Sequence, residues 1–152
     1  MPIPGARYGH TNVVATDWRR LAAFYVEVFG CEFVPPERDY AGADLERGTG
    51  VMGAALQGAH LRLPGGAPNG PTLEIYQYTQ ESARHPTAAN RPGFGHIAFV
   101  VDEVEAGREA VLAAGGGSVG EAVTLTTADG RRVTWCYVTD PEGNIVELQS
   151  WS

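Results

Sequence analysis

Apolar and polar residues follow a similar order in the two halves of this chain. In the first half, Gly9 to Ala15 is a short apolar stretch typical of a strand. Thr16 or Asp17 can cap a helix that follows it. This predicted helix carries apolar residues on one face at helical spacing, namely Leu21, Phe24, Tyr25, Val28 and Phe29. Gly30 stands where a helix C-terminus favours a residue that tolerates positive φ.

The second half opens in the same way. Gly95 to Val101 predicts a strand, and Asp102 with Glu105 resembles a capping box at the start of a helix. The predicted helix runs over Val104, Ala110, Val111 and Leu112 into what we interpret as a flexible glycine run, Gly115 to Gly117.

Each half then closes with predicted strands. Those of the first half are Cys31 to Val34, Met52 to Leu63 and Thr72 to Tyr78. Those of the second half are Ala122 to Thr127, Arg132 to Val138 and Ile145 to Trp151. Asp129-Gly130 is a strong hairpin signal, and Asp140 to Asn144 is a turn signal. Both halves therefore predict a βαβββ module.

The modules span residues 5–78 and 93–152, and together they predict one domain over residues 1–152. Thr79 to Pro92, polar and proline-containing, is interpreted as the linker between them. Asp39 to Gly50 is a polar insertion without a counterpart in the second half. A segment of this kind is equally compatible with a lid over a site and with a tolerated surface loop.

Four residues that can bind a metal fall at matched places in the two modules. His10 and His96 stand near the start of the opening strands, and Glu74 and Glu147 stand in the middle of the closing strands. Strand alternation puts each of them opposite the residues suited to packing against a helix. A single strand histidine is more often structural, and a single strand glutamate more often solvated. Four of them at matched positions favour a metal site.

The pairing of two imidazoles with two carboxylates suits Zn²⁺, Ni²⁺, Co²⁺, Mn²⁺ or Fe²⁺. A carboxylate in an apolar strand is also costly to bury unless it is paired or bound to a metal. Further residues are assigned to a substrate pocket because they alternate in phase with these four or lie on neighbouring strands: Asn12, His60, Arg62, Tyr76, Tyr137 and Gln149. His60 could donate protons and Arg62 could bind an anionic group, unless both lie at an edge or on the surface.

Composition and charge argue against nucleic-acid-binding, membrane-spanning and secreted proteins. The 152 residues are 43% hydrophobic and carry a net charge of −7, which argues against a nucleic-acid partner. No apolar run reaches the roughly 18 residues that a membrane span needs. The first residues, Met1 to Arg7, show no secretory signal, so a cytoplasmic protein is expected. Cys31 and Cys136 lack a metal or redox spacing and are interpreted as buried thiols.

The sequence resembles the vicinal-oxygen-chelate superfamily, which includes glyoxalase I, epimerases, extradiol dioxygenases and bleomycin-binding proteins. The resemblance rests on Gly9-His10 with the helix segment Leu21 to Tyr25, on Gly95 to Phe99, and on Asp140 to Leu148. It implies an α+β fold in which paired βαβββ modules form an open, curved mixed sheet around a metal-centred cavity. It also implies a homodimer and a small-molecule substrate.

The ligand set is most similar to that of glyoxalase I-like proteins, in which His10, Glu74, His96 and Glu147 would hold one divalent ion. The resemblance implies a metal-assisted proton shift of the isomerase or lyase type on a small carbonyl or thioester substrate. The shift would pass through an enediolate-like intermediate, with Glu147 as base and Glu74 as its near-equivalent.

The residues also bear on three other functions within the superfamily. Epimerases carry a glutamate on the third strand of the first module, and that strand has no carboxylate here. An extradiol Fe²⁺ dioxygenase would need an acid/base histidine that Thr126 to Arg132 does not supply. A metal-free protein that sequesters an antibiotic would leave all four ligands unused.

Overall fold

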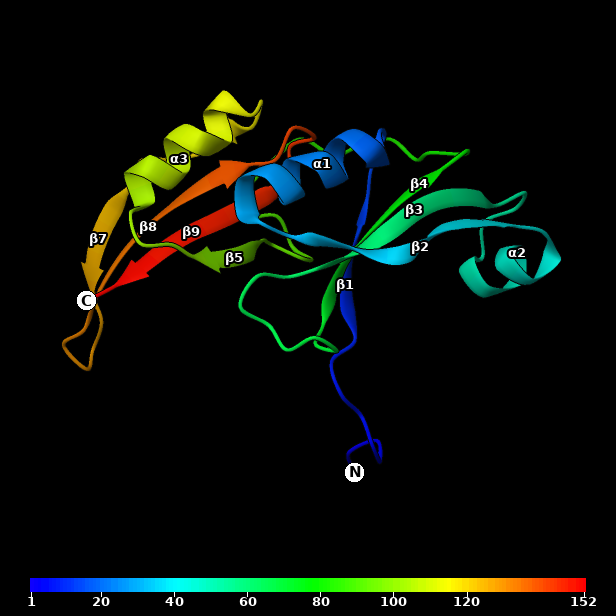
Figure 1. Cartoon of the computed structure of the whole chain (residues 1–152), viewed down its shortest axis with the longest axis horizontal. Helices are drawn as coiled ribbons and strands as arrows, with labels where there is room; N and C mark the ends of the chain where they lie inside the picture. Colours follow the sequence, from blue (N-terminus) through cyan, green and yellow to red (C-terminus); the bar gives the residue numbers. More distant parts are fainter. The chain divides into compact units, whose positions relative to one another are not determined.

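The computed structural model describes residues 1–152 and divides the chain into two compact units, Met1–Ala83 and Arg84–Ser152. Each unit has its own mixed sheet with helices packed on it, and the sheets do not close (Figure 1). The predicted α+β class and the paired modules are confirmed, with one sheet in each unit. The domain boundaries set from the sequence stay a prediction.

The first unit has the predicted order of elements plus one short helix. Its elements are β1 (His10–Val14), α1 (Trp18–Phe29), β2 (Glu32–Ala41), α2 (Ala43–Thr49), β3 (Ala55–Arg62) and β4 (Thr72–Tyr78). The sheet order is β1-β4-β3-β2, with β1 parallel to β4 and the other neighbours antiparallel. Helix α1 packs on β3 and β4.

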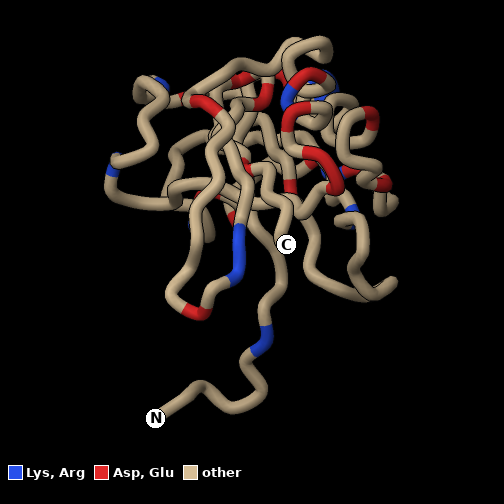
Figure 2. Tube along the Cα trace, turned by 90° about the vertical axis from the view of Figure 1, so that its left-hand side faces the viewer, with Lys and Arg blue, Asp and Glu red and all other residues tan.

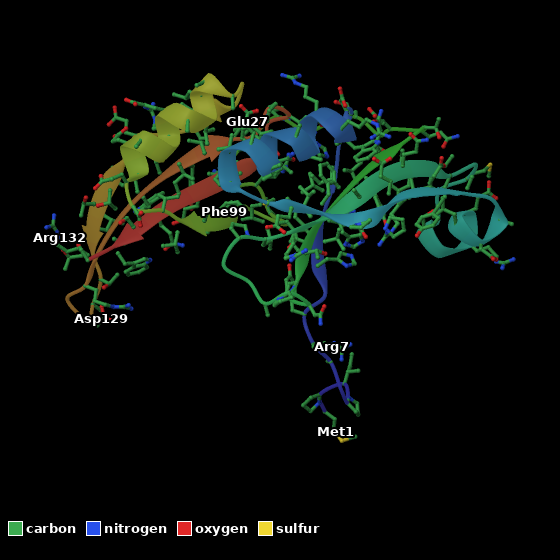
Figure 3. The ribbon with its side chains drawn as sticks, in the orientation of Figure 1. Met1, Arg7, Glu27, Phe99, Asp129 and Arg132 are labelled. Carbon is green, nitrogen blue, oxygen red and sulfur yellow. The ribbon has the colours of Figure 1, made fainter.

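The ends of α1 follow from local chemistry. The Asp17 carboxylate accepts a hydrogen bond from the Arg20 N–H at 3.0 Å, and Gly30 ends the helix with φ 70°. Leu21 and Tyr25 are fully buried, whereas Glu27 is on the exposed face (Figure 3). Leu61, Leu73 and Ile75 of the sheet are buried as well, so the face of β3 and β4 toward α1 forms the core of this unit.

The second unit repeats this arrangement with one strand interrupted. Its elements are β5 (Ile97–Val100), α3 (Val104–Ala113), β6 (Gly117–Ser118), β7 (Val123–Thr126), β8 (Arg132–Thr139) and β9 (Ile145–Trp151). The sheet order is β5-β9-β8, and β6 and β7 pair with different stretches of β8. Together β6 and β7 take the place that β2 has in the first unit, so the βαβββ repeat is confirmed.

Strand alternation in the second unit also follows the prediction. Ile97 and Phe99 of β5 are half-buried, and Ala98 and Val100 are exposed (Figure 3). Helix α3 packs on β8 and β9 and buries Val104 and Val111 against them. The predicted hairpin joins β7 to β8, with Asp129 in its turn (Figure 3). Its carboxylate accepts a hydrogen bond from Arg131 Nε at 2.9 Å.

Four local predictions are wrong, and two of them concern β2 and the segment that follows it. Strand β2 does not end at Val34, because only Pro35, Pro36 and Glu37 interrupt its pairing, and pairing resumes at Arg38. Prolines cannot donate to the ladder, which accounts for the register shift there. Asp39 to Gly50 is therefore the end of β2 followed by α2, not a loop, and α2 buries no residue.

The other two corrections concern α3. Its N-cap is Glu103, which makes no side-chain capping bond, so the expected Asp102–Glu105 capping box does not form. Gly117 belongs to the short strand β6 because its N–H donates to Thr139 Oγ1 at 3.0 Å and its backbone pairs with Thr139. The glycine run thus includes a residue held in the sheet.

The segment after Ala83 is attached to the second unit at the Asp140–Asn144 turn. Thr87 Oγ1 donates to the Gly143 carbonyl at 2.8 Å, and Arg84 bonds Glu142 Oε2 at 3.1 Å. The predicted turn is confirmed, and Asp140, 1% exposed, holds it from within. Its carboxylate accepts from the Glu142 N–H at 2.9 Å, from the Asn144 N–H at 3.0 Å and from Asn144 Nδ2 at 2.8 Å.

The basic residues are all arginines, and Figure 2 marks them as short separate segments along the trace. No helix has the length and apolar character that would let it span a bilayer.

Candidate metal centre

The face of the first sheet opposite the buried core carries a compact polar patch. Residues in direct register on neighbouring strands point to the same face. The patch has three rows, each with one residue from β1, β4 and β3: His10, Thr72 and Arg62; Asn12, Glu74 and His60; Val14, Tyr76 and Gly58. We call it the β4 patch, because Glu74 of β4 stands at its centre.

Glu74 is only 7% exposed and is surrounded by hydrogen-bond donors. Asn12 Nδ2 donates to its Oε1 at 2.9 Å, and His10 Nε2 lies 3.5 Å from the same oxygen. His60 Nε2 lies 2.7 Å from Oε2. The two oxygens of Glu74 therefore face two different histidines, and the cost of burying the carboxylate is offset by these partners.

His60 has a partner on each ring nitrogen. Its Nδ1 lies 2.7 Å from Thr72 Oγ1, opposite the contact of Nε2 with Glu74. Burial lowers the pKa of His60, and this effect exceeds the opposing effect of the Glu74 carboxylate. The imidazole is thus neutral at pH 7. A neutral ring has one N–H, so the consistent arrangement is Nε2–H donating to Glu74 and the Thr72 hydroxyl donating to Nδ1.

Tyr76 completes the surroundings of Glu74. Burial, followed by a hydrogen bond to Glu74, raises the pKa of the Tyr76 phenol, which therefore stays protonated and donates to the carboxylate. Its ring lies over Gly58. A Cβ at Gly58 would come within 2.0 Å of the Ile75 carbonyl oxygen and 2.6 Å of Tyr76 Cδ1. Glycine is therefore required at this place in β3.

The second unit has a simpler pair in the matching position. His96 Nε2 lies 2.8 Å from Glu147 Oε2, with side chains 32% and 18% exposed. The Tyr137 ring lies 4.9 Å from the His96 ring and 4.9 Å from that of Trp135. Gln149 Oε1 accepts a hydrogen bond from Trp151 Nε1 at 2.5 Å.

The registers of the two sheets can be compared position by position. Glu147 pairs with Ala98 of β5 and Tyr137 of β8, as Glu74 pairs with Asn12 of β1 and His60 of β3. His10 stands two residues before Asn12, the β1 partner of Glu74. In the same way, His96 stands two residues before Ala98, the β5 partner of Glu147. The histidine and the glutamate of each pair therefore stand at corresponding register positions in the two sheets.

Three residues of the first unit offer ligand atoms to one cation. His10, His60 and Glu74 each present one such atom, and the three atoms lie within 4.8 Å of one another. Ligand atoms around a divalent ion at about 2.1 Å are typically ~3 to 3.5 Å apart, so a small inward movement would complete a site. A nearly buried carboxylate beside two imidazoles is also the donor set that a borderline cation takes.

Arg62 lies in the outer row of the β4 patch. Its guanidinium is 3.5 Å from Glu32 Oε2, and its Nε is buried without a hydrogen-bond partner. Arg62 lines a cavity of about 180 Å³ with neighbours from the end of α1, the start of β2 and the loop after β3: Gly30, Glu32, Leu63, Pro64, Gly65, Gly66 and Pro68.

Sequence reasoning missed two features of the patch. His60 was assigned to a pocket wall, yet it contacts Glu74 directly. Thr72 was given no role, yet it holds the other nitrogen of His60. The available signal was the turn-rich segment between β3 and β4, which implies a hairpin in which His60 faces the strand that carries Glu74.

Comparison with known proteins gives the family. The model of the Glyoxalase/Bleomycin resistance protein/Dioxygenase superfamily matches residues 7–148. The chain belongs to this superfamily. The superfamily contains many enzymes, some of which bind a divalent metal, and also members that are not enzymes. Among curated proteins, none matches the sequence.

Solved structures of the superfamily share the fold with this chain. A glyoxalase family protein from Bacillus cereus has a TM-score of 0.81 at 18% identity, covering 99% of each chain. One from Enterococcus faecalis has a TM-score of 0.62 at 22% identity, covering 97% of this chain and 99% of its own. A fosfomycin resistance protein from Listeria monocytogenes, complexed with Mn(II) and sulfate, has a TM-score of 0.54 at 16% identity, covering 98% and 93%.

Proposed function

We propose that this superfamily member is a metal-dependent enzyme that catalyses a proton shift beside a carbonyl, of the isomerase or lyase type. The ligands that we propose for the divalent cation are the four residues matched in the sequence repeat: His10, Glu74, His96 and Glu147. The observation that carries the proposal is the repeated His–Glu contact, 3.5 Å in the first unit and 2.8 Å in the second, at matched register positions. Two glutamates with the same histidine contact in a sequence-divergent repeat favour a shared chemical role.

When bound, a divalent cation supplies Lewis-acid stabilisation for negative charge that develops on the substrate oxygens. The side chains of the chain supply the proton transfer. In the proposed step, Glu147 accepts the proton as the C–H bond next to the carbonyl breaks. The electron pair of that bond forms the C=C bond of an enediolate-like intermediate, and the π electrons of the C=O bond move onto its oxygen. Where the substrate carries an adjacent hydroxyl, the proton of that hydroxyl passes to this oxygen, and the hydroxyl carbon becomes the new carbonyl. Glu147 then returns the proton to the neighbouring carbon, so no oxidant or reductant is needed.

The surroundings of the two glutamates favour Glu147 over Glu74 as the base. Glu74 is in contact with Asn12, His60, Tyr76 and His10, so its lone pairs are largely occupied. Glu147 has the more exposed side chain, 18% against 9%, and its charged contact is with His96 alone. A carboxylate with free lone pairs is better suited to accept a proton from a substrate.

Arg62 supports a substrate that carries an anionic group. The buried Nε lacks a partner and the single long contact with Glu32 leaves guanidinium donors available, because arginine has five N–H groups. The cavity beside it, about 180 Å³, has room for a carboxylate or a phosphoryl group. We therefore propose a small carbonyl or thioester substrate with a negatively charged substituent.

The proposal is tested by hydrogen exchange in D₂O, followed by proton NMR. The probes are the hemithioacetal of methylglyoxal with glutathione and an α-substituted acyl-CoA thioester, each with protein reconstituted in turn with Zn²⁺, Ni²⁺, Co²⁺, Mn²⁺ or Fe²⁺. The Mn(II) complex of the Listeria relative makes Mn²⁺ a natural member of this panel. We expect metal-dependent loss of the C–H signal of at least one probe.

Glu147→Gln should retain much of the metal but lose exchange by at least about 100-fold, the usual contribution of a positioned acid or base. His85→Ala is the matched control, since His85 is an exposed histidine outside the β4 patch and the His96–Glu147 pair. Wild-type exchange in a metal-loaded Glu147→Gln variant would contradict the assigned base.

A further inference from the structure

The β4 patch contains a second histidine that has no part in the repeat-matched pairs. His60 lies closer to Glu74 than His10 does, 2.7 Å against 3.5 Å between the nitrogen and the carboxylate oxygen. Its side chain is 16% exposed, so it is held in the sheet face and does not extend freely into solvent. The four-residue metal site leaves this histidine without a function.

We propose that His60 is an additional metal ligand and that Thr72 is the residue that orients it. The inference rests on the proposed function, because it concerns the same cation. It adds a ligand that the repeat of the sequence does not contain. The first unit then contains three candidate ligands of the cation, His10, His60 and Glu74.

The positions of the ligand atoms support this assignment. His60 Nε2 and Glu74 Oε2 are 2.7 Å apart, and His10 Nε2 and Glu74 Oε1 are 3.5 Å apart. Neighbouring donors on one divalent ion at ~2.1 Å are separated by about 3 Å, which is the range that both contacts span. The His10 and His60 rings meet edge to face, with centroids 5.4 Å apart, so both can direct Nε2 toward Glu74.

Thr72 gives His60 the property that a metal-binding histidine needs. A ligating imidazole commonly donates its second N–H to an oxygen, which fixes the ring and its tautomer. Thr72 Oγ1 is placed for this role, 2.7 Å from His60 Nδ1. Moving the proton from Nε2 to Nδ1 reverses the Thr72 hydrogen bond and frees the Nε2 lone pair. No rotation of the ring is required, because a hydroxyl both donates and accepts.

The second unit shows that the fold itself does not require this pair. At the position of His60 it has Tyr137, and at the position of Thr72 it has Ile145. The residues that replace them, a phenol and an alkyl group, do not reproduce the imidazole–hydroxyl contact. Both members of the pair are thus present in one unit and absent from the other, which is expected when the two residues act together.

The extra imidazole also changes which cation the site should prefer. Imidazole donors suit Zn²⁺, Ni²⁺, Co²⁺ and Fe²⁺, whereas carboxylate and water suit Mg²⁺ and Mn²⁺. A site that includes His60 should therefore favour the first group of cations more strongly than the same site without His60. Loss of His60 should reduce the preference for Zn²⁺ over Mn²⁺.

The test is metal binding by the full-length apoprotein, without any substrate. Zn²⁺ and Mn²⁺ affinities are measured by competition with a chromophoric chelator, and Co²⁺ is added as a spectroscopic probe of ligand number. The variants are His60→Ala, His60→Gln and Thr72→Val, with His85→Ala as the matched control. Circular dichroism and thermal unfolding establish that each variant is folded, and His60→Gln keeps an amide donor toward Glu74 should His60→Ala not fold.

We expect both His60 variants to bind Zn²⁺ at least 10-fold more weakly than wild type and to shift the visible absorption of bound Co²⁺. Thr72→Val should weaken Zn²⁺ binding by about 10- to 100-fold, as for other residues that orient a ligand. Folded His60 variants with wild-type affinity and an unchanged Co²⁺ spectrum would overturn the inference. If His10→Ala and Glu147→Ala lose metal in that case, the proposed function survives. A wild-type protein that binds no metal would overturn both.

Discussion

Gly58→Ala tests the packing that holds Glu74 and Tyr76 in place. Gly58 of β3 pairs with Tyr76 of β4, and an added methyl group would lie 2.0 Å from the Ile75 carbonyl oxygen. Ordinary C···O contacts are about 3.3 Å or longer, so the overlap exceeds about 1 Å. The obstructing atom belongs to the backbone of the neighbouring strand. Relief of the overlap therefore requires β3 and β4 to separate locally.

The expected cost is large for one methyl group. Overpacking a well-packed region typically costs about 1 to 3 kcal/mol, and an overlap with backbone belongs at the upper end. Replacing glycine with alanine also restricts the unfolded chain, which returns about 0.4 to 1 kcal/mol. We therefore expect a net loss of roughly 2 kcal/mol in the free energy of unfolding, equivalent to about 4 to 8 °C in Tm.

The assay is thermal unfolding followed by circular dichroism, supported by urea titration. Gly9→Ala is the matched control, because a Cβ at Gly9 would meet no atom within 4 Å and Gly9 has no positive φ. That variant should unfold within about 1 kcal/mol of wild type. If Gly58→Ala is as stable as Gly9→Ala, the close approach of β3 and β4 is wrong, and so is the placement of Tyr76 over Gly58.

Three further variants probe the turn, the core and the substrate pocket. Asp140→Ala removes three hydrogen bonds to a buried carboxylate and should lower the free energy of unfolding by about 3 kcal/mol, measured by urea titration. A loss under ~1 kcal/mol would refute the role of Asp140 in holding the turn. Burial raises the pKa of Cys31 to about 11, so between pH 9 and pH 11 the thiol ionises in the unfolded chain but not in the folded protein. The free energy of unfolding should therefore fall over this range, and Cys31→Ala should lessen the fall. A Cys31→Ala variant with the same pH profile of stability as wild type would refute this. Arg62→Gln should raise KM for an anionic probe substrate about 10-fold or more with a smaller change in kcat; equal KM values would exclude Arg62 from binding.

Much of the fold could be predicted from short-range patterns. The strand Thr72–Tyr78 was predicted with its observed bounds, because its apolar residues alternate and turn residues precede it. The ends of α1 follow from Asp17 and Gly30, whose capping chemistry is local. The matched positions of Glu74 and Glu147 were also available, since repeats preserve the place of a residue within a strand.

The remaining errors come from interactions between distant residues. The continuation of β2 beyond Pro36 depends on pairing with β3, which compensates for the missing proline N–H groups. The contact of His60 with Glu74 depends on the register of β3 against β4, which the loop between them sets. A one-residue change in that register would place His60 on the core face. Strand periodicity alone therefore could not give His60 and Thr72 their observed roles.

The most direct test of the metal assignment is elemental analysis of the purified protein after reconstitution with Zn²⁺, Ni²⁺, Co²⁺, Mn²⁺ or Fe²⁺. His10→Ala and Glu147→Ala are analysed beside wild type, with His85→Ala as the control. We expect about one divalent cation per wild-type and control chain and a clear loss in both ligand variants, as when one partner of a ligand set is removed. Wild-type protein that retains no cation from any member of the panel would contradict the metal assignment.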